Sequence, residues 1–500
     1  MKGCIALQRQ WAVIGNAMAL ELKNKHGVEE FCGYITTRRA ERFINSQKDV
    51  EYTALLLDED LHNQYKQERL DIEYLKKLEA EYGIPNLWLY MTVDRTIMMN
   101  IPPKEYSISP APPYTHEEML RIMQVKFRNI IKFFEKEKPD FIIMPPMGSM
   151  GAMVLYGVAK KMGIKTFVMG FGRIKKFETF TEDFKTLTGV EEIFKKIRKE
   201  NYKSPHFEKA KKFLEDFTKK PISYYQPPKN SVQNSIQKIK NAPISIFNSI
   251  KFILVSTVKY LRDPHRSDKT TENPWYALVN KLTLRIRSLR NLKRLYDEPK
   301  LGEDFAYFPL HLEPEISLDF LAPFFTNQLA LISQIAKSLP SHFKLYVKEH
   351  QPMLNYRPTK YYKELKKIPS VRFINTATNS FDLIKNSKII ITITGTVGWE
   401  AALLKKPVIT FGDIFFNSLS MVKKCKTIED LPYIIKQQLG NFKYDEKEAI
   451  DMISALFEDA INFDHTGLWE KGDYEQIKND PDFPKFVSVL AKKLGLSHKG

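Results

Sequence analysis

The chain has 500 residues, of which 43% are hydrophobic, 12% aromatic and 27% charged. This is the composition of a globular protein and excludes long disordered tracts. The length exceeds one compact core, so we expect two domains with additional segments. The three cysteines, Cys4, Cys32 and Cys425, lie far apart and outside any Cys/His ligand spacing. A disulfide scaffold and a structural zinc site are therefore not expected.

The N-terminal segment is apolar but has no small-residue cleavage site after a clean hydrophobic run. We predict that it forms the first strand and helix of a folded domain rather than a signal peptide. No stretch reaches the ~20 uninterrupted apolar residues of a membrane-spanning helix. The nearest, residues 243–261, is interrupted by Asn248, Lys251 and Lys259. Together with the cysteine usage, this favours a cytoplasmic location.

Residues 1–215 alternate short apolar runs with longer amphipathic ones. We predict buried strands at Tyr52–Leu57, Leu87–Met91 and Phe141–Met144, and helices at Met119–Lys136 and Ala152–Met162. Strands that alternate with helices at this rhythm predict a parallel sheet covered by helices, in a Rossmann-like N-terminal domain.

Two polar segments follow predicted strands of this domain. The triplet Asp58-Glu59-Asp60 imitates the DxD motif with which GT-A glycosyltransferases hold a metal ion, but its polar surroundings favour a solvated loop, and we expect no metal site. Gly148 and Ser149 belong to a strand-to-helix turn that could approach a substrate or could be a tight turn and nothing more.

Residues 216–300 form a basic segment, predicted to be helical. Between positions 221 and 300 there are fifteen Lys or Arg against five Asp or Glu, within a net charge of +18. Such a patch suits nucleic acid, an anionic membrane surface or a polyanionic substrate. The absence of nucleic-acid-binding motifs argues against specific nucleic-acid recognition.

Apolar residues recur in this segment every three or four positions, at Ile244, Phe247, Ile250, Leu254 and Val258. This spacing is typical of a helix lying at a membrane interface, and it predicts peripheral contact with an anionic membrane through residues 229–294. The same residues could instead pack the segment onto the body of the protein, and the sequence leaves both interpretations open.

A second α/β unit, residues 301–440, is predicted to be a C-terminal Rossmann-like domain. Its predicted strands are Phe305–Phe308, Phe343–Val347, Val371–Ile374, Ile389–Thr394 and Pro407–Phe411. Its predicted helices are Phe320–Leu339, Tyr361–Lys366, Ser380–Lys385 and Gly398–Leu404. Residues 441–500 are expected to form helices that pack back on the body. Two such domains place a ligand in the cleft at the carboxyl ends of their strands.

The segment 388–413, KIIITITGTVGWEAALLKKPVITFGD, predicts a strand, a turn bracketed by Gly395 and Gly398, and a helix. Backbone N–H groups and the helix dipole at such a turn favour a phosphate, and threonine hydroxyls there can assist. Glu400, predicted in the first turn of the helix, could accept hydrogen bonds from ribose hydroxyls. It could equally stabilise the helix N-terminus.

Two other predicted strands of this domain end in polar residues. Lys348 and His350 follow one strand and could contact a phosphate, although a lone histidine there is often only a structural hydrogen-bonding group. His311 and Glu315 lie on the loop after the domain's first strand and would face the cleft between the domains.

Taken together, YFPLHLEPE (307–315), YVKEHQP (346–352) and TGTVGWEAALLKKPVITFGD (394–413) resemble the bacterial capsule polysaccharide biosynthesis family. This GT-B-like family includes Kdo transferases that build capsule lipid linkers, and the resemblance covers about residues 303–420. It implies a GT-B-like α/β fold, with two Rossmann-like domains facing a cleft and the basic helical segment between them.

The resemblance also implies a nucleotide-sugar substrate, CMP-Kdo-like in its nearest relatives, and no cofactor or metal ion. The donor would be bound by Glu315, Lys348, His350, Thr394, Gly395, Thr396, Gly398 and Glu400. Two departures from the pattern concern the nucleotide base: Gln351 follows His350 where proline is usual, and the turn carries threonines where serine is common.

In inverting GT-B enzymes a carboxylate or histidine deprotonates the acceptor hydroxyl. Asp94, which follows the predicted strand Leu87–Met91, and His311 are the candidates for catalysis. Asp94 could equally be a structural partner of Arg95. Gly148 and Ser149 would lie on the acceptor side.

The predicted function is transfer of a sugar from a nucleotide-activated donor to a surface polysaccharide or its lipid-linked precursor. Two alternatives remain: a nucleotide-sugar epimerase or hydrolase of the same fold, and a non-catalytic component of polysaccharide assembly or export.

Overall fold

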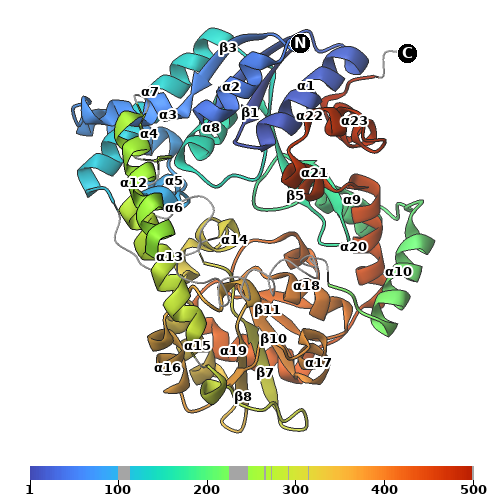
Figure 1. Ribbon diagram of the computed structural model, residues 1–500. Helices are drawn as coiled ribbons and strands as arrows, with labels where there is room; N and C mark the ends of the chain where they lie inside the picture. Colours follow the sequence, from blue (N-terminus) through green and yellow to red (C-terminus); the bar gives the residue numbers. More distant parts are fainter. Residues whose placement is uncertain are drawn as a thin grey trace.

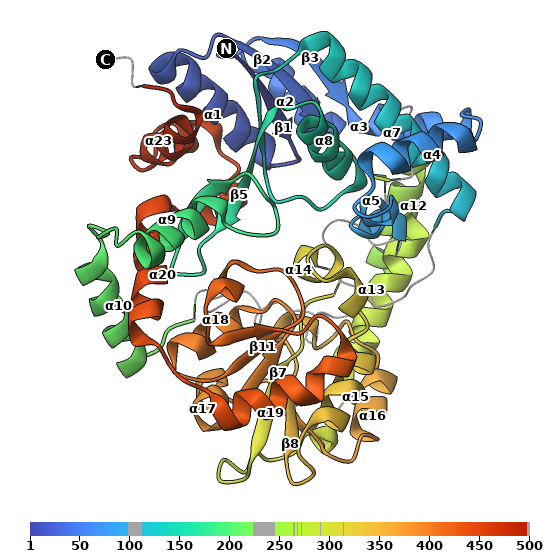
Figure 2. The same cartoon turned by 180° about the vertical axis from the view of Figure 1, so that it is seen from behind.

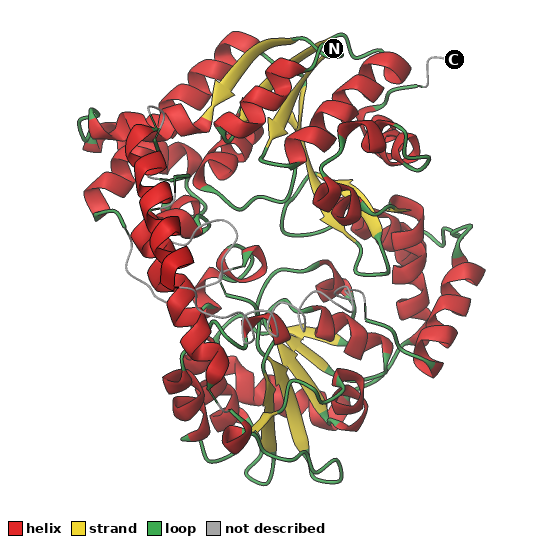
Figure 3. Cartoon of the chain, viewed as in Figure 1, coloured by secondary structure: helices red, strands yellow, loops and turns green. Residues whose placement is uncertain are grey.

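A computed structural model gives the fold of the chain (Figure 1). It describes residues 1–98, 113–223, 246–263, 266–267, 269–271, 273–290, 292–313 and 315–497. Two sheets lie in opposite halves of the molecule, each covered by helices (Figure 3).

The first half is built on a seven-stranded sheet in the order β13-β6-β5-β4-β1-β2-β3. Its strands are β1 (Lys2–Leu7), β2 (Glu30–Ile35), β3 (Tyr52–Leu57), β4 (Phe141–Met144), β5 (Lys165–Phe171), β6 (Phe177–Thr181) and β13 (Ile461–Asn462). The pairs among β1 to β5 are parallel, whereas β6 runs antiparallel to both β5 and β13. The carboxyl ends of β1 to β5 therefore share one edge.

Helices bury both faces of this sheet. They are α1 (Trp11–His26), α2 (Arg38–Ser46), α3 (Asp58–Asn63), α4 (Ile72–Tyr82), α5 (Trp88–Thr92), α6 (Arg95–Met98), α7 (His116–Glu137) and α8 (Met150–Lys161). One core cluster joins α1 and α2 to the sheet, and another joins α4, α5, α7 and α8 to it. Helix α7 begins with a capping box between Thr115 and Glu118, which satisfies N–H groups that a helix start leaves without partners.

The second half contains a six-stranded sheet, entirely parallel, in the order β12-β11-β10-β7-β8-β9. Its strands are β7 (Phe305–Pro309), β8 (Lys344–Lys348), β9 (Val371–Ile374), β10 (Ile389–Thr392), β11 (Val408–Thr410) and β12 (Val422–Lys424). Its helices are α14 (Ile316–Asp319), α15 (Gln328–Ser338), α16 (Thr359–Lys366), α17 (Ser380–Asn386), α18 (Thr396–Leu403) and α19 (Leu431–Asn441). The predicted GT-B-like α/β fold with two Rossmann-like parallel sheets is confirmed.

The last part of the chain returns to the first half (Figure 2). Helix α20 (Glu446–Asp459) packs against α9 (Thr188–Lys199) and α10 (Phe207–Lys219). Beyond it, β13 joins the first sheet. The remaining helices, α21 (His465–Lys471), α22 (Tyr474–Lys478) and α23 (Phe483–Leu494), contribute to the core around α1. The residue limits predicted for independent domains remain a prediction.

Helices α12 (Ile246–Arg262) and α13 (Pro274–Leu289) pack together and run along one side of the molecule, from one half to the other (Figure 1). The segment between them is tied to the first half, because Lys269 forms ion pairs with Asp58 and Asp94. At the far end of α13, Arg287 donates to the carbonyl of Tyr356 in the second half. The basic segment is thus a strut that contacts both halves.

Three sequence predictions about local structure are wrong. Leu87–Met91 is not a strand, because residues 88–92 form the short helix α5; a short apolar run has the same pattern in a buried helix and in a strand. The triplet Asp58-Glu59-Asp60 is not a solvated loop: it begins α3, and Asp58 and Glu59 are buried. The helix predicted from Phe320 begins only at Gln328, after a short turn that starts at Pro323.

Candidate functional site

The predicted donor loops start at three neighbouring strands, β10, β7 and β8, whose carboxyl ends share an edge. His311, on the loop after β7, lies at the meeting point of these loops. Its Nε2 atom is 3.3 Å from the Thr392 hydroxyl and accepts a hydrogen bond, also 3.3 Å long, from the backbone N–H of Thr394. The loops after β7 and β10 therefore form one polar corner.

The backbone of His311 is fixed from both sides. Its N–H donates to the side chain of Gln328 over 2.7 Å, and its carbonyl accepts from the Arg357 guanidinium over 2.7 Å. Burial, followed by the neighbouring cations His350 (when protonated) and Arg357, lowers the pKa of His311 to about 3. The imidazole is therefore neutral at pH 7 and can hold a ligand by a hydrogen bond but not by charge.

The turn after β10 is built by its own hydroxyls. The Thr392 hydroxyl accepts from the backbone N–H of Gly395 over 3.1 Å, and the Thr394 hydroxyl donates to the carbonyl of Ser317 over 2.7 Å. Thr394 is buried, whereas Gly395 and Thr396 are partly accessible. A Cβ atom on Gly395 would lie 2.7 Å from the Thr392 hydroxyl, so this tight corner needs glycine.

Helix α18 begins at Thr396, two residues earlier than predicted. Glu400 therefore stands in the second turn rather than the first, and its side chain is buried. Gly398 allows the helix to approach Phe416 and the end of β10, because a Cβ atom there would lie about 3 Å from both Thr392 and Phe416. The expectation that Glu400 lies in the first turn is wrong.

The loop after β8 is held by a buried ion pair between Arg357 and Glu349. Glu349 also accepts hydrogen bonds from the backbone N–H of His350, over 2.7 Å, and from the hydroxyl of Tyr362, over 2.9 Å. Burial, then Arg357 and Lys348, lowers the pKa of His350 to about 4. Within the described residues, its buried Nδ1 atom has no hydrogen-bond partner.

Lys348 turns toward a different loop. Its ammonium group donates to the carbonyl of Thr378 over 2.5 Å and to the hydroxyl of Ser380 over 2.8 Å. Burial lowers its pKa to about 8, so the group is largely charged at pH 7. Lys348 thus supplies positive potential beside the β8 loop while bonding to the segment between β9 and α17.

The two halves meet at this corner. Arg173, on the loop after β5, donates to the Thr396 hydroxyl over 3.0 Å. Glu315 accepts from the Ser317 hydroxyl over 2.6 Å, and its pKa is raised by burial, an effect that Ser317 and Arg173 partly offset. The predicted donor residues around Thr396 are therefore contacted by a cation from the opposite half.

The predicted residues of the first half form a second group. Asp94 accepts from the backbone N–H of Met150 over 3.0 Å and from the Thr96 hydroxyl over 2.6 Å, and it lies 3.0 Å from the ammonium of Lys269. Burial opposes its ionisation, but Lys269 and these donors lower its pKa to about 2. Its contacts are those of a group that positions the start of α8.

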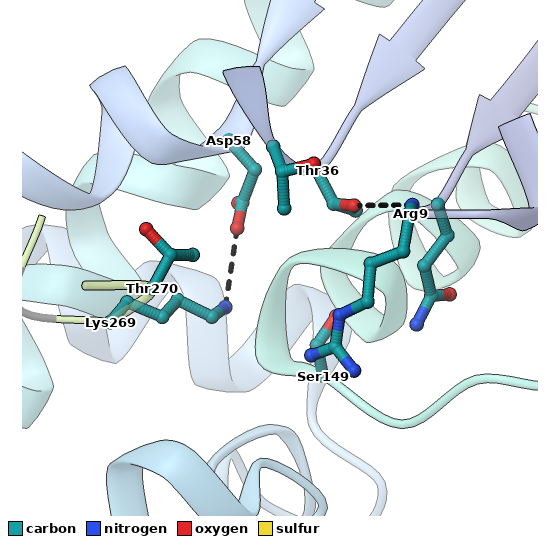
Figure 4. Close-up of a pocket in the computed structure, with 8 residues that line it drawn as sticks. Arg9, Thr36, Asp58, Ser149, Lys269 and Thr270 are labelled. Carbon is teal, nitrogen blue, oxygen red and sulfur yellow. Dashed lines mark hydrogen bonds and ion pairs between the residues drawn. The ribbon is translucent and has the colours of Figure 1, made fainter. Parts of the chain in front are cut away.

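Gly148 and Ser149 lie just before α8. Ser149 is the N-cap of this helix, and its hydroxyl accepts from the backbone N–H of Ala152 over 3.3 Å. Gly148 is half-buried beside it. Ser149 also lines a pocket in the first half, together with Arg9 and Asp58 (Figure 4).

Two residues of the interface between the halves were missed by the sequence analysis. Arg173 follows a strand-end glycine in GFGR, a signal that could have been noticed. Asp319 ends α14, and burial together with Glu313 and Glu315 raises its pKa to about 7, against the effect of Arg95 from the first half. Nothing in the local sequence distinguishes Asp319 from a surface aspartate.

Within the described ranges, no group of three or more His, Cys, Asp or Glu side chains is arranged to hold a metal ion. No helix in the same part of the chain combines the length and apolar character needed to cross a membrane.

Residues 201–426 match the model of the family described as capsule polysaccharide biosynthesis protein. The match includes all three motifs of the second half, and it confirms the resemblance to this family. A curated relative, protein FixF of Sinorhizobium fredii (strain NBRC 101917 / NGR234), is 29% identical over 140 residues, which are 27% of this chain and 32% of the relative. The alignment thus spans about a third of that relative's length.

Solved structures with a similar arrangement include two kinds of protein. The Thermosulfurimonas dismutans KpsC beta Kdo 2,4 transferase is 12% identical, with 64% of this chain and 80% of that chain covered and a TM-score of 0.37. The Methanocaldococcus jannaschii UDP-GlcNAc 2-epimerase, solved with UDP-GlcNAc and UDP, is 15% identical, with 92% and 99% covered and a TM-score of 0.27.

Proposed function

We propose that this chain is a glycosyltransferase that moves a sugar from a nucleotide-activated donor to a bacterial surface polysaccharide or its lipid-linked precursor. The observation that carries the proposal is the polar corner at which His311, Thr392 and Thr394 meet, at the carboxyl ends of adjacent parallel strands. Ligands of open parallel sheets bind at this edge. The match to the capsule polysaccharide family over residues 201–426 supports a role in capsule synthesis.

In this proposal the donor phosphate lies at the partly accessible turn of Gly395 and Thr396. The N-terminus of α18 contributes its dipole and N–H groups, and Arg173 supplies a charge from the opposite half, since its guanidinium already contacts the Thr396 hydroxyl. The neutral His350, with a buried Nδ1 atom lacking a partner in the described structure, would bind the nucleotide by a hydrogen bond. Arg173 and the helix terminus would stabilise charge developing on the leaving phosphate.

For the acceptor's proton we propose Asp319 as the general base, with Asp94 as a positioning group. Asp319 is the last residue of α14, the short helix that follows Glu315, and Arg95 of the first half acts on it; its pKa of about 7 suits proton transfer near neutrality. Asp94 is paired with Lys269, and its pKa of about 2 makes it a weak base. Asp319→Asn should abolish transfer while leaving nucleotide binding intact, whereas Asp94→Asn should mainly lower stability.

The first test is a thermal-shift screen with CMP, UDP, GDP and ADP, because a ligand that binds only the native state raises the melting temperature. We expect one nucleotide to stabilise the protein, and His350→Ala and Arg173→Gln to reduce the shift. A preference for CMP would indicate a Kdo-like or sialic-acid-like donor. If no nucleotide binds, the assignment of a donor site is wrong.

A second assay separates transfer from its rivals. The preferred nucleotide is supplied as its sugar conjugate, with and without an acceptor glycan, and products are followed by mass spectrometry. Acceptor-dependent release of the nucleotide supports transfer. Rapid conversion of the donor without acceptor favours an epimerase or hydrolase, and full biological output from a His350→Ala variant favours a non-catalytic component.

We further propose that α12 and α13 hold the enzyme at an anionic membrane surface. Helix α13 exposes an apolar stripe with i, i+4, i+7 spacing, formed by Trp275, Val279, Leu282, Ile286 and Leu289. On α12, Leu254 and Val258 are also exposed, which argues against the alternative that they pack onto the body. The earlier part of the predicted stripe, Ile244, lies outside the described residues, as do residues 229–243 of the predicted membrane contact.

Basic residues accompany this apolar surface, including the exposed Lys259 and Lys281. Apolar burial combined with attraction to anionic lipid is the physical basis of interfacial helices. The wild type should float with liposomes of phosphatidylglycerol but not of phosphatidylcholine, and less so at high salt. Ile286→Glu should reduce flotation at an unchanged melting temperature. A stable dimer in light scattering that Ile286→Glu dissolves would instead assign the stripe to a second copy of the chain.

A further inference from the structure

A pocket lies at the carboxyl edge of the first sheet, on the half opposite the proposed donor site (Figure 4). Its walls come from segments far apart in sequence: Arg9 follows β1, Thr36 follows β2, Asp58 follows β3, Ser149 precedes α8, and Lys269 belongs to the strut. It is a small recess that opens partly to solvent. The end of a parallel sheet is where such folds bind ligands.

Arg9 is the charged group of this pocket that has no direct ion pair with any described residue. Its guanidinium forms no hydrogen bond or ion pair to any described residue. Burial and the repulsion of Arg95, partly offset by Asp94, lower its pKa to about 10, so it remains charged at pH 7. The chain holds Arg9 in the left-handed region with φ of 50°, while its backbone N–H donates to the Thr36 hydroxyl over 3.1 Å (Figure 4). Such strained positions cluster at functional sites.

The other charges at the pocket are already compensated. Asp58 accepts hydrogen bonds from the Tyr34 hydroxyl and the Lys126 ammonium, and its second oxygen lies 3.2 Å from the ammonium of Lys269. Burial alone would raise the pKa of Asp58, but Lys126 and Lys269 hold it well below its usual range. Lys269 also pairs with Asp94. Within the described part of this cluster, the direct ion pairs thus go to Lys126 and Lys269, and Arg9 interacts with Asp94 only at longer range.

Three hydroxyl groups line the pocket, and each can donate a hydrogen bond to a ligand. Thr36 accepts the N–H of Arg9 over 3.1 Å, Thr37 accepts an N–H of α2 over 3.3 Å, and Ser149 accepts an N–H of α8 over 3.3 Å. A hydroxyl that accepts in this way keeps its own hydrogen to donate. One guanidinium and three hydroxyl hydrogens around a small space are donors suited to a carboxylate or a phosphate.

We propose that this pocket binds an anionic group, a carboxylate or a phosphate, of the acceptor, with Arg9 as its main ligand. The pocket would then select an acidic glycan or a phosphate-bearing precursor and present it to the donor bound in the other half. The identification of the ligand as an acceptor rests on the proposed function, whereas the binding of an anion does not.

The test measures anion binding directly, by isothermal titration calorimetry or ligand-observed NMR. The probes are galacturonate and inorganic phosphate, with galactose as the neutral counterpart of galacturonate. At least one anion should bind the wild type, galactose should not, and Arg9→Gln should weaken binding roughly tenfold or more because a charge-assisted hydrogen bond is lost. Arg39→Gln, which removes an exposed arginine of α2, is the matched control and should bind as the wild type does.

The two anions separate the two possible sources of the ligand. Stronger binding of galacturonate assigns a sugar carboxylate, and stronger binding of phosphate assigns a phosphate ester. Binding of neither anion, equal binding of galactose, or full binding by Arg9→Gln overturns the proposal. Circular dichroism shows whether Arg9→Gln is folded, and a second variant, Thr36→Val, must weaken binding as well.

The same variants keep this proposal distinct from the proposed function. Arg9→Gln should retain the nucleotide-induced thermal shift and should raise the KM for acceptor with little change in the KM for donor. Sugar transfer without binding of either anion would refute only the anion pocket. Binding of the anions without binding of any nucleotide would refute only the transferase assignment.

Discussion

Replacement of Lys269 by methionine removes the ion pairs that tie the strut to the first half. The Lys269 ammonium lies 3.0 Å from a carboxylate oxygen of Asp94 and 3.2 Å from one of Asp58. Asp58 keeps Lys126 as a direct partner. Asp94 keeps hydrogen bonds from Thr96 and Met150, but among the described residues no direct ion pair, since Arg9 acts on it only at longer range. Truncating one member of a buried ion pair costs about 3–5 kcal/mol, because the other charge stays buried without compensation.

We therefore expect Lys269→Met to lower the free energy of unfolding by about 3 kcal/mol or more at pH 7. The double variant Lys269→Met/Asp94→Asn should recover part of this loss, since it removes the uncompensated charge. Urea denaturation followed by tryptophan fluorescence measures both, provided that the m values match. Lys259→Met, which changes an exposed lysine of α12, is the control and should stay within about 0.5 kcal/mol of the wild type.

The pH dependence gives a second check on the same variant. In the wild type the pKa of Asp94 is about 2, below its ordinary value of 3.8, so its stabilising contribution is present above pH 3.8 and lost as the pH falls toward 2. Without Lys269, burial raises this pKa and penalises the charged form. The stability gap between wild type and Lys269→Met should therefore shrink as the pH falls from 7 toward 4. A gap below about 1 kcal/mol at pH 7, or one that does not change with pH, would refute the reasoning.

Three further predictions concern single positions. Burial raises the pKa of Asp319 from 3.8 to about 7, so its favourable contribution to stability is present below pH 3.8 and lost as the pH rises through 7. In thermal melts between pH 4 and 8, Asp319→Asn should therefore become more stable relative to the wild type, by up to about 4 kcal/mol at 1.4 kcal/mol per pKa unit. Gly151→Ala would overlap the Tyr34 hydroxyl and should cost about 1–3 kcal/mol in urea denaturation, and an unchanged midpoint would contradict this packing. Gly395→Ala would place a Cβ atom 2.7 Å from the Thr392 hydroxyl and 3.1 Å from His311. It should weaken nucleotide binding in calorimetry and cost about 1–3 kcal/mol of stability; undiminished affinity in the folded variant would count against the site.

The sequence alone could predict most of the second half. Apolar runs between polar turns identified five strands of its sheet, β7 to β11, and missed the edge strand β12. The strands β7, β8 and β10 begin within a residue of their predicted positions. Parallel strands with helical crossovers place their carboxyl ends on one edge. The convergence of His311, His350 and the Thr394 turn was therefore foreseeable from the order of three motifs. Local periodicity and chain connectivity sufficed for that result.

Other features were decided by contacts between residues far apart in sequence. Lys269 belongs to the basic segment, whose packing the sequence left open, and the structure buries it against two aspartates of the first half. Arg173 reaches Thr396 from a loop 223 positions earlier. Leu87–Met91 forms a helix although its apolar run fits a strand equally well. Composition and periodicity indicate the secondary structure of each segment. The partner of a charged group and the burial of a side chain depend on packing between segments, which only the tertiary structure supplies.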